Sequence, residues 1–144
     1  MLGDPSHDGL FLGGVRVLVV DDCEYVRSAV IAMLEHYGAA ATAVATAAEA
    51  LEAVERERPH VLVSDLQMPG RGGCWLIRQV RALPPERGGA TPAAALTGVI
   101  GPEHRASILR AGFQYHLEKP LAPRQLAGVV AILALKVDPL LRTE

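Results

Sequence analysis

The chain has 144 residues, about the size of one domain, and half of them are hydrophobic, so it can bury a core without a disulfide or metal scaffold. Its formal net charge of −2 argues against a nucleic-acid partner held by a basic field. The two cysteines are too few for a disulfide scaffold, no uninterrupted apolar run is long enough to span a membrane, and the first residues lack the positive segment of a signal peptide. We therefore expect one cytoplasmic domain with free thiols and no membrane or nucleic-acid partner.

Short apolar runs alternate along the chain with segments whose apolar residues recur at helical spacing. The runs predict strands and the periodic segments predict amphipathic helices. Thr46 and Glu49 form a capping box at one helix start, and Gly38 and Gly112 are expected to stop the helices before them. In chain order we expect a strand at 15–20, a helix at 24–37, a strand at 39–44, a helix from 46 to about 58, a strand at 60–64, a helix at 75–83, a strand at 93–96, a helix at 103–111, a strand at 113–118 and a helix from 123 to about 137.

Strand and helix thus alternate five times. This pattern is typical of βαβ crossovers, a mostly parallel sheet and helices on both of its faces. We therefore predict a doubly wound α/β domain over residues 15–137. A loose tail at residues 1–14 and a second tail at residues 138–144 are expected to flank it.

Chemically active side chains follow four of the predicted strands. The first strand leads into Asp21 and Asp22, the third into Asp65, the fourth into Thr97 and the fifth into Lys119. Ligands of open parallel sheets bind outside the carboxyl ends of the strands, so we expect these groups to share one rim. Clustered carboxylates need a cation, and hard oxygen ligands with room for water suit Mg²⁺. Mg²⁺ beside a lysine and a hydroxyl predicts a phosphoryl site, in which an aspartate could also be the nucleophile.

Each of these residues also has an ordinary structural explanation. Asp21 and Asp22 could cap a helix, and Asp65 could serve turn chemistry. Thr97 and Lys119 taken alone carry little information. Their conjunction favours function, because all four strand ends carry a suitable group and the chain uses lysine at only two positions, against twelve arginines.

Four segments contain these strand ends: VLVVDD (17–22), VLVSDLQMPG (61–70), ALTG (95–98) and AGFQYHLEKP (111–120). In order and spacing they resemble the receiver domains of two-component response regulators, over most of the chain. The resemblance implies a flavodoxin-like (CheY-like) fold: a five-stranded parallel sheet in the order 2-1-3-4-5 with five helices.

The resemblance also assigns roles at the acidic end of the site. It implies that Asp65 is the phosphoacceptor and that a phosphohistidine of a histidine kinase or a histidine phosphotransfer protein is the donor. Asp21, Asp22 and Asp65 are expected to hold Mg²⁺, with the backbone carbonyl of Gln67 as a further ligand.

The remaining roles concern the bound phosphoryl group and the switch. By resemblance, Thr97 and Lys119 bind the phosphoryl oxygens, and the bond from Lys119 to Pro120 is cis. Thr97 and His116 are the expected switch pair, although family members usually carry Tyr or Phe at the His116 position. Tyr115 is a rival for this role, and an ordinary half-exposed strand position explains His116 equally well. Gly98 also departs from the usual alanine.

Three functions were therefore weighed. The preferred one is a signalling module that phosphorylates and dephosphorylates only itself, and so is not an enzyme with a separate substrate. A degenerate receiver that serves as a docking scaffold is an alternative, which Gly98 and His116 keep open. A Mg²⁺-dependent phosphatase with an aspartyl nucleophile is less favoured, because Gln67 stands where a general acid is expected and no cap insertion is present.

The segment predicted as the last helix is apolar nearly all round. Such a helix either packs into its own domain or docks a partner. We prefer an interface formed by residues 103–111, 113–118 and 123–137, used for a homodimer or a partner domain. By family analogy, the phosphodonor is expected to dock near Cys23 and Ala29 on the first helix.

Overall fold

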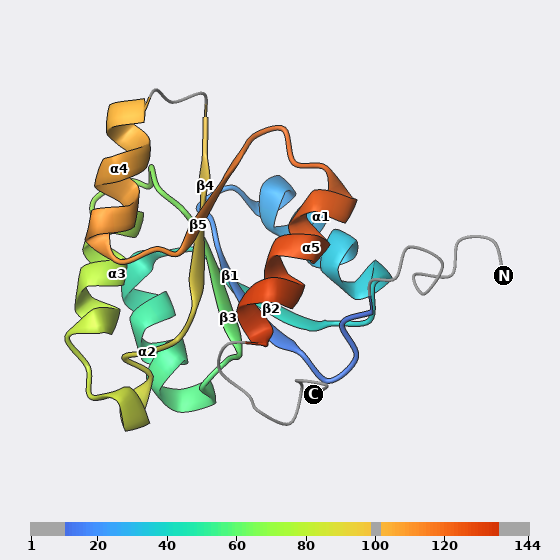
Figure 1. The fold of residues 1–144 in the computed structure, drawn as a ribbon, viewed down its shortest axis with the longest axis horizontal. Helices are drawn as coiled ribbons and strands as arrows, with labels where there is room; N and C mark the ends of the chain where they lie inside the picture. Colours follow the sequence, from blue (N-terminus) through green and yellow to red (C-terminus); the bar gives the residue numbers. More distant parts are fainter. Residues whose placement is uncertain (1–10, 99–101, 136–144) are drawn as a thin grey trace, which may run out of the picture.

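A computed structural model describes residues 11–98 and 102–135 of the chain (Figure 1). The sheet contains β1 (Arg16–Val20), β2 (Ala40–Val44), β3 (Val61–Asp65), β4 (Ala93–Thr97) and β5 (Tyr115–Glu118). The helices are α1 (Glu24–His36), α2 (Ala47–Glu57), α3 (Gly73–Arg81), α4 (Pro102–Ala111) and α5 (Pro123–Ala134), with a short 3₁₀ turn, η2 (Pro85–Arg87).

All neighbouring strands are parallel, and their order is β2-β1-β3-β4-β5. This confirms the predicted fold class and strand order. The register brings the carboxyl ends of the strands to one edge, because Val20 pairs with Ser64 and Thr97 pairs with Glu118. The residues at or just after the strand ends therefore meet at a common rim.

The sheet lies between two layers of helices (Figure 1). Helices α1 and α5 cover one face, and α2, α3 and α4 cover the other. The central strands β1, β3 and β4 are apolar over most of their length, because both faces of the sheet are buried. In β1, Val17 and Val19 pack toward α1 and α5, whereas Leu18 and Val20 pack in the opposite core.

The packed fold begins before the predicted boundary at residue 15. Leu12 is 1% exposed and belongs to the core between the sheet, α1 and α5. Its backbone N–H donates to the carbonyl of Tyr37 at 2.6 Å. Residues 11–14 are thus not a loose tail, because the buried Leu12 side chain fixes them to the core. Residues 1–10 and 136–144, with the predicted end of the last helix at 137, lie outside the described residues.

Element boundaries differ from the predicted ones by a few residues. α5 ends at Ala134, and β5 begins at Tyr115 because Phe113 turns into the core instead of joining the ladder. The exposed connection at 84–89 contains η2, which begins with a proline at its first position. One hydrogen bond of the predicted capping box is present, since the Thr46 hydroxyl accepts from the N–H of Glu49 at 3.1 Å. The Glu49 carboxylate accepts from the N–H of Ala45 at 3.2 Å, one residue before Thr46.

Among the described residues, no helix combines the length and the apolar character that a bilayer crossing requires.

Candidate functional site

The rim of the sheet gathers the predicted carboxylates. Asp21 follows β1 and Asp65 ends β3, so neighbouring strands deliver them. Ligand atoms of Asp21, Asp22 and Asp65 all lie within 4.8 Å of one another. Asp21 is 1% exposed and Asp65 is 7% exposed, whereas Asp22 is open to solvent. Two of the three carboxylates are therefore largely withdrawn from water.

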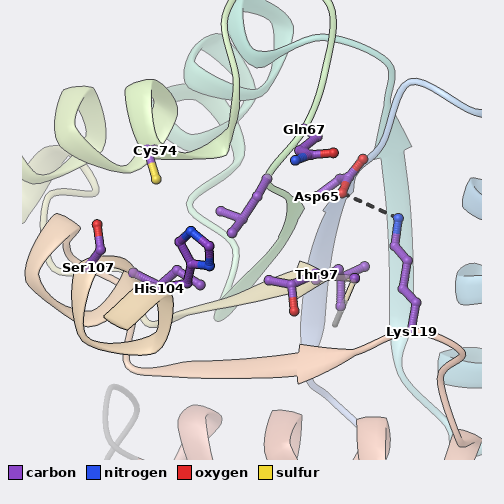
Figure 2. Close-up of a pocket in the computed structure, with 11 residues that line it drawn as sticks. Asp65, Gln67, Cys74, Thr97, His104, Ser107 and Lys119 are labelled. Atoms are coloured by element: carbon purple, nitrogen blue, oxygen red, sulfur yellow. Dashed lines mark hydrogen bonds and ion pairs between the residues drawn. The ribbon is translucent and has the colours of Figure 1, made fainter. Parts of the chain in front are cut away.

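Lys119 provides the opposite charge at this rim. Its Nζ lies 3.3 Å from Asp65 Oδ1 and 3.5 Å from Asp21 Oδ2 (Figure 2). The N–H of Lys119 donates to the carbonyl of Thr97 at 2.7 Å, and the peptide bond to Pro120 is cis, as predicted. One ammonium between three carboxylates leaves two formal negative charges when all four groups are ionised.

The environment shifts two of these groups. Burial raises the pKa of Asp65, and the Asp21 carboxylate adds to this rise, while Lys119 and the N–H of Gln67 lower it in part. Burial lowers the pKa of Lys119, but the attraction of Asp65 and Asp21 outweighs it, so the net pKa of Lys119 is raised. A poorly solvated carboxylate beside another favours a nearby cation.

The loop after β1 holds Asp21 in place. The N–H of Cys23 donates to Asp21 Oδ1 at 2.9 Å, which is an Asx-type turn. Arg27 on the first turn of α1 donates from Nη1 to the Asp21 carbonyl at 2.8 Å. The carboxylate keeps Oδ2 turned to Lys119. Sequence reasoning did not single out Arg27, whose role depends on the helix start.

Gly73, at the start of α3, lies against the backbone of Asp65. A Cβ at this position would lie 2.5 Å from the Asp65 carbonyl oxygen, too close for any other residue. The glycine thus lets α3 begin directly behind the carboxylate, two residues before the predicted start.

Thr97 lies at the end of β4 and is 3% exposed. Its hydroxyl donates to the carbonyl of Leu117 over a long 3.5 Å, and Figure 2 shows it turned away from Asp65. A hydrogen bond of this length is weak. The hydroxyl is therefore held only loosely on the side of β5.

A cleft of about 600 Å³ opens beside Asp65, between the rim, α3 and α4. Asp65, Thr97 and Lys119 line one end, and Cys74 from α3 lies near His104 and Ser107 from α4 at the other (Figure 2). Sequence reasoning missed these last three residues. A usable signal existed, because the first turns of helices that follow rim loops must lie near the same rim.

Two predicted site residues lie less centrally. Gln67 is exposed and lines the cleft, and its N–H faces the Asp65 carboxylate. His116 is half-buried in β5, paired with Ala95, and is absent from the cleft lining.

The part of the sequence that contains these strand ends matches a known protein family. The model of the response regulator receiver domain matches residues 17–131. The chain belongs to this family. Receiver domains of two-component systems interact with kinases or phosphotransfer proteins.

Similar receiver sequences occur alone and within longer proteins. The chain is 42% identical over 128 residues to an uncharacterised 14.6 kDa protein in the sodA1 3′ region of Leptolyngbya boryana, covering 89% of this chain and 96% of that one. It is 37% identical over 116 residues to the sensor protein GacS of Pseudomonas syringae pv. syringae, covering 80% of this chain but 13% of GacS. The chain therefore spans about one eighth of that relative.

A solved structure matches the fold closely. The receiver domain of a sensor histidine kinase from Pseudomonas aeruginosa PAO1 superimposes with a TM-score of 0.76 at 29% identity, over 85% of this chain and 98% of that one. That structure has a magnesium ion coordinated in its active site cleft.

Proposed function

We propose that this receiver domain is a phosphorylatable switch in which Asp65 accepts a phosphoryl group from a phosphohistidine of a histidine kinase or histidine phosphotransfer protein. The observation that carries the proposal is the placement of the Asp65 carboxylate at the mouth of a cleft, between an acidic pair and the Lys119 ammonium, with Nζ 3.3 Å from Oδ1.

The donor set fits Mg²⁺. Three carboxylates within 4.8 Å supply the hard oxygen ligands that this ion prefers, and the exposure of Asp22 leaves room for water. Asp21, Asp22 and Asp65 would hold the ion, with the Gln67 carbonyl as a further ligand. When bound, Mg²⁺ supplies charge neutralisation for the phosphoryl oxygens and the carboxylates.

The transfer itself is an in-line displacement. One oxygen of Asp65 attacks phosphorus, a P–O bond forms, and the P–N bond to the donor imidazole breaks with its electron pair going to nitrogen. Lys119 then pairs with an oxygen of the new acyl phosphate. Thr97 reaches the same group only after its hydroxyl leaves the Leu117 carbonyl. This release costs little free energy, because the 3.5 Å hydrogen bond is weak.

The switch follows from that movement. When the Thr97 hydroxyl turns toward Asp65, it leaves space on the side of β5, and His116 is the side chain we propose to respond. The phosphoryl group thereby shifts a two-state equilibrium of α4, β5 and α5.

The same three elements expose apolar side chains suited to a partner. Leu109 on α4, Tyr115 on β5 and Ile132 and Leu135 at the end of α5 are 36–47% exposed. The stripe formed by Leu126, Val130 and Leu133 is buried in the core, so self-packing accounts for most of the apolar character of α5. We propose that the exposed remainder contacts a partner domain or a second copy in a symmetric dimer.

We propose that this domain has no separate substrate, because its chemistry is self-modification. We also propose a cytoplasmic location, since its two free cysteines suit a reducing compartment. The docking-scaffold alternative is weakened by the gathering of all the expected polar groups at one rim. The phosphatase alternative is also weakened, because Gln67 stands where such an enzyme is expected to carry a carboxylic acid as its general acid.

Intact mass after incubation with Mg²⁺ and acetyl phosphate tests the proposal. The wild type is expected to gain one labile phosphoryl group, and Asp65→Asn none. Glu52→Gln, an isosteric change on an exposed carboxylate of α2, is the matched control and should label like the wild type. Labelling of Asp65→Asn at the wild-type level contradicts the assignment. Failure of the wild type to bind either phosphoryl or beryllofluoride favours the docking scaffold.

A further inference from the structure

α3 ends in an arginine that makes five hydrogen bonds. Arg81 Nε donates to the Gly112 carbonyl at 3.1 Å, and Nη2 donates to the same oxygen at 2.8 Å. Nη1 donates to the carbonyls of Gly89 and Thr91 at 2.9 and 2.7 Å. Nη2 also donates to Gln114 Oε1 at 3.3 Å. One side chain thus uses its whole guanidinium fork.

The acceptors belong to the ends of three elements. Gly89 and Thr91 lead into β4, while Gly112 ends α4 and, with Gln114, leads into β5. Gln114 Oε1 also accepts from the N–H of Ala93 at 2.8 Å, which closes the network. The network lies at the amino ends of β4 and β5. At about 3.3 Å per residue, the Thr97 and Lys119 rim is roughly 15 Å away.

The acceptors of Arg81 are all carbonyl oxygens, and none of them is a carboxylate that would balance its charge. A half-buried cation of this kind is a costly way to gain stability, since well-packed apolar side chains often do as well. The planar guanidinium fixes the relative positions of its acceptors. A lysine or an apolar side chain does not do this. The network therefore points to a positioning role.

In the described residues, α4 packs into the core near its carboxyl end, where Arg81 also binds the Gly112 carbonyl. Among its described side chains only Ile108 is buried, and Leu109 is 47% exposed. The opposite end carries His104, which lines the cleft beside Asp65. At the carboxyl end, Gly112 has φ +130°, and a Cβ there would lie 3.0 Å from Arg81 Cγ. Glycine therefore provides both the backbone turn and the space for the arginine.

We propose that Arg81 is a positioning residue that anchors the carboxyl end of α4 to the amino ends of β4 and β5. The inference rests on the proposed phosphoryl switch. With this end fixed, a displacement of Thr97 and Lys119 at the rim moves the cleft end of α4 about Gly112. Without the anchor, the strand ends and the helix shift independently, and the rim still takes its ligand but α4 does not respond.

Hydrogen exchange of the amides in residues 103–111, measured with and without Mg²⁺ and beryllofluoride, tests the proposal. Fluorine NMR on the same samples measures how much beryllofluoride is bound. Arg81→Met keeps the aliphatic stem and removes all donors. Arg81→Lys keeps the charge and restores part of the network. Val80→Ala, a neighbouring change in the core of α3, controls for lost stability alone.

In the wild type we expect the ligand to change α4 exchange by about threefold or more. Arg81→Met should bind beryllofluoride within about twofold of the wild type but lose most of the α4 response, with partial recovery in Arg81→Lys. Val80→Ala should keep the response. If Arg81→Met fails to fold, Gln114→Ala removes one exposed acceptor and should give a reduced response.

Three outcomes overturn the inference. A full α4 response in Arg81→Met, or in Gln114→Ala where that variant replaces it, shows that no anchor is needed. An equal loss in Val80→Ala shows that stability alone sets the response. A wild type that binds no beryllofluoride overturns the proposed function and this inference together, and the fluorine measurement distinguishes that case from the first two.

Discussion

Replacing Lys119 with methionine should destabilise the Mg²⁺-free domain, because the ammonium offsets the repulsion between two carboxylates that are largely buried. Nζ lies 3.3 Å from Asp65 and 3.5 Å from Asp21. Methionine keeps most of the length and the apolar stem of the side chain, and it removes the charge together with the two hydrogen bonds that the ammonium donates. The carboxylates then face each other within 4.8 Å, with Asp22 beside them.

The magnitude follows from these distances. At an effective dielectric constant near 20, each attraction is worth about 5 kcal/mol before any correction. Desolvation of the ammonium and screening of a side chain that is one-third exposed offset most of it. We expect a net loss of about 1–3 kcal/mol in the free energy of unfolding. Saturating Mg²⁺ should reduce the loss to less than about 1 kcal/mol, because the ion neutralises the same carboxylates.

Equilibrium urea unfolding with a chelator and with saturating Mg²⁺ measures both quantities. Lys119→Arg keeps the charge and serves as the control, with a smaller loss in chelator. An equal loss for Lys119→Met in the two buffers would refute the reasoning, since it would separate the lysine from the metal-binding carboxylates. So would a variant as stable as the wild type in chelator.

Three further predictions concern the core, the pH dependence and the hydroxyl. Leu12→Ala should lower the free energy of unfolding by about 2–5 kcal/mol in urea titrations, and a loss below about 1 kcal/mol would contradict the packing of residues 11–14. Because burial raises the pKa of Asp65 above its ordinary 3.8, ionised Asp65 costs stability without Mg²⁺. Asp65→Asn should therefore be more stable than the wild type at pH 7 in chelator. This difference in the free energy of unfolding should fade as the pH drops through the raised folded-state pKa toward 3.8. A difference that grows on acidification would contradict the raised pKa. Thr97→Val should change stability by less than about 1 kcal/mol, because the bond to Leu117 is long, yet weaken beryllofluoride binding roughly tenfold; unchanged binding measured by fluorine NMR would exclude a role for the hydroxyl.

Strand positions and the polar rim could be predicted from the sequence because both depend on local patterns. A buried parallel strand reads as an apolar run, and the residue after it falls at the carboxyl edge whatever the rest of the chain does. Asp21, Asp65 and Lys119 were therefore found together. The strand order and the individual roles came from the family resemblance.

Contacts that depend on tertiary packing were not predictable in this way. Leu12 lies in a polar, glycine-rich segment, and its burial depends on a neighbour at Tyr37. In the sequence Arg81 looks like an ordinary helix-end arginine. Its acceptors are three backbone carbonyls and the Gln114 side chain, up to 33 residues away, and they carry no sequence signal.

The ion pairs of Lys119 join residues that are 54 and 98 positions apart in the chain. No fragment that ends before Lys119 contains them, and α5 follows Lys119 in the chain. A chain still emerging from the ribosome, or one cut within β5, contains Asp21 and Asp65 without the ammonium that pairs with them. The ion pairs at the rim therefore form only after the chain has passed the last strand of the sheet.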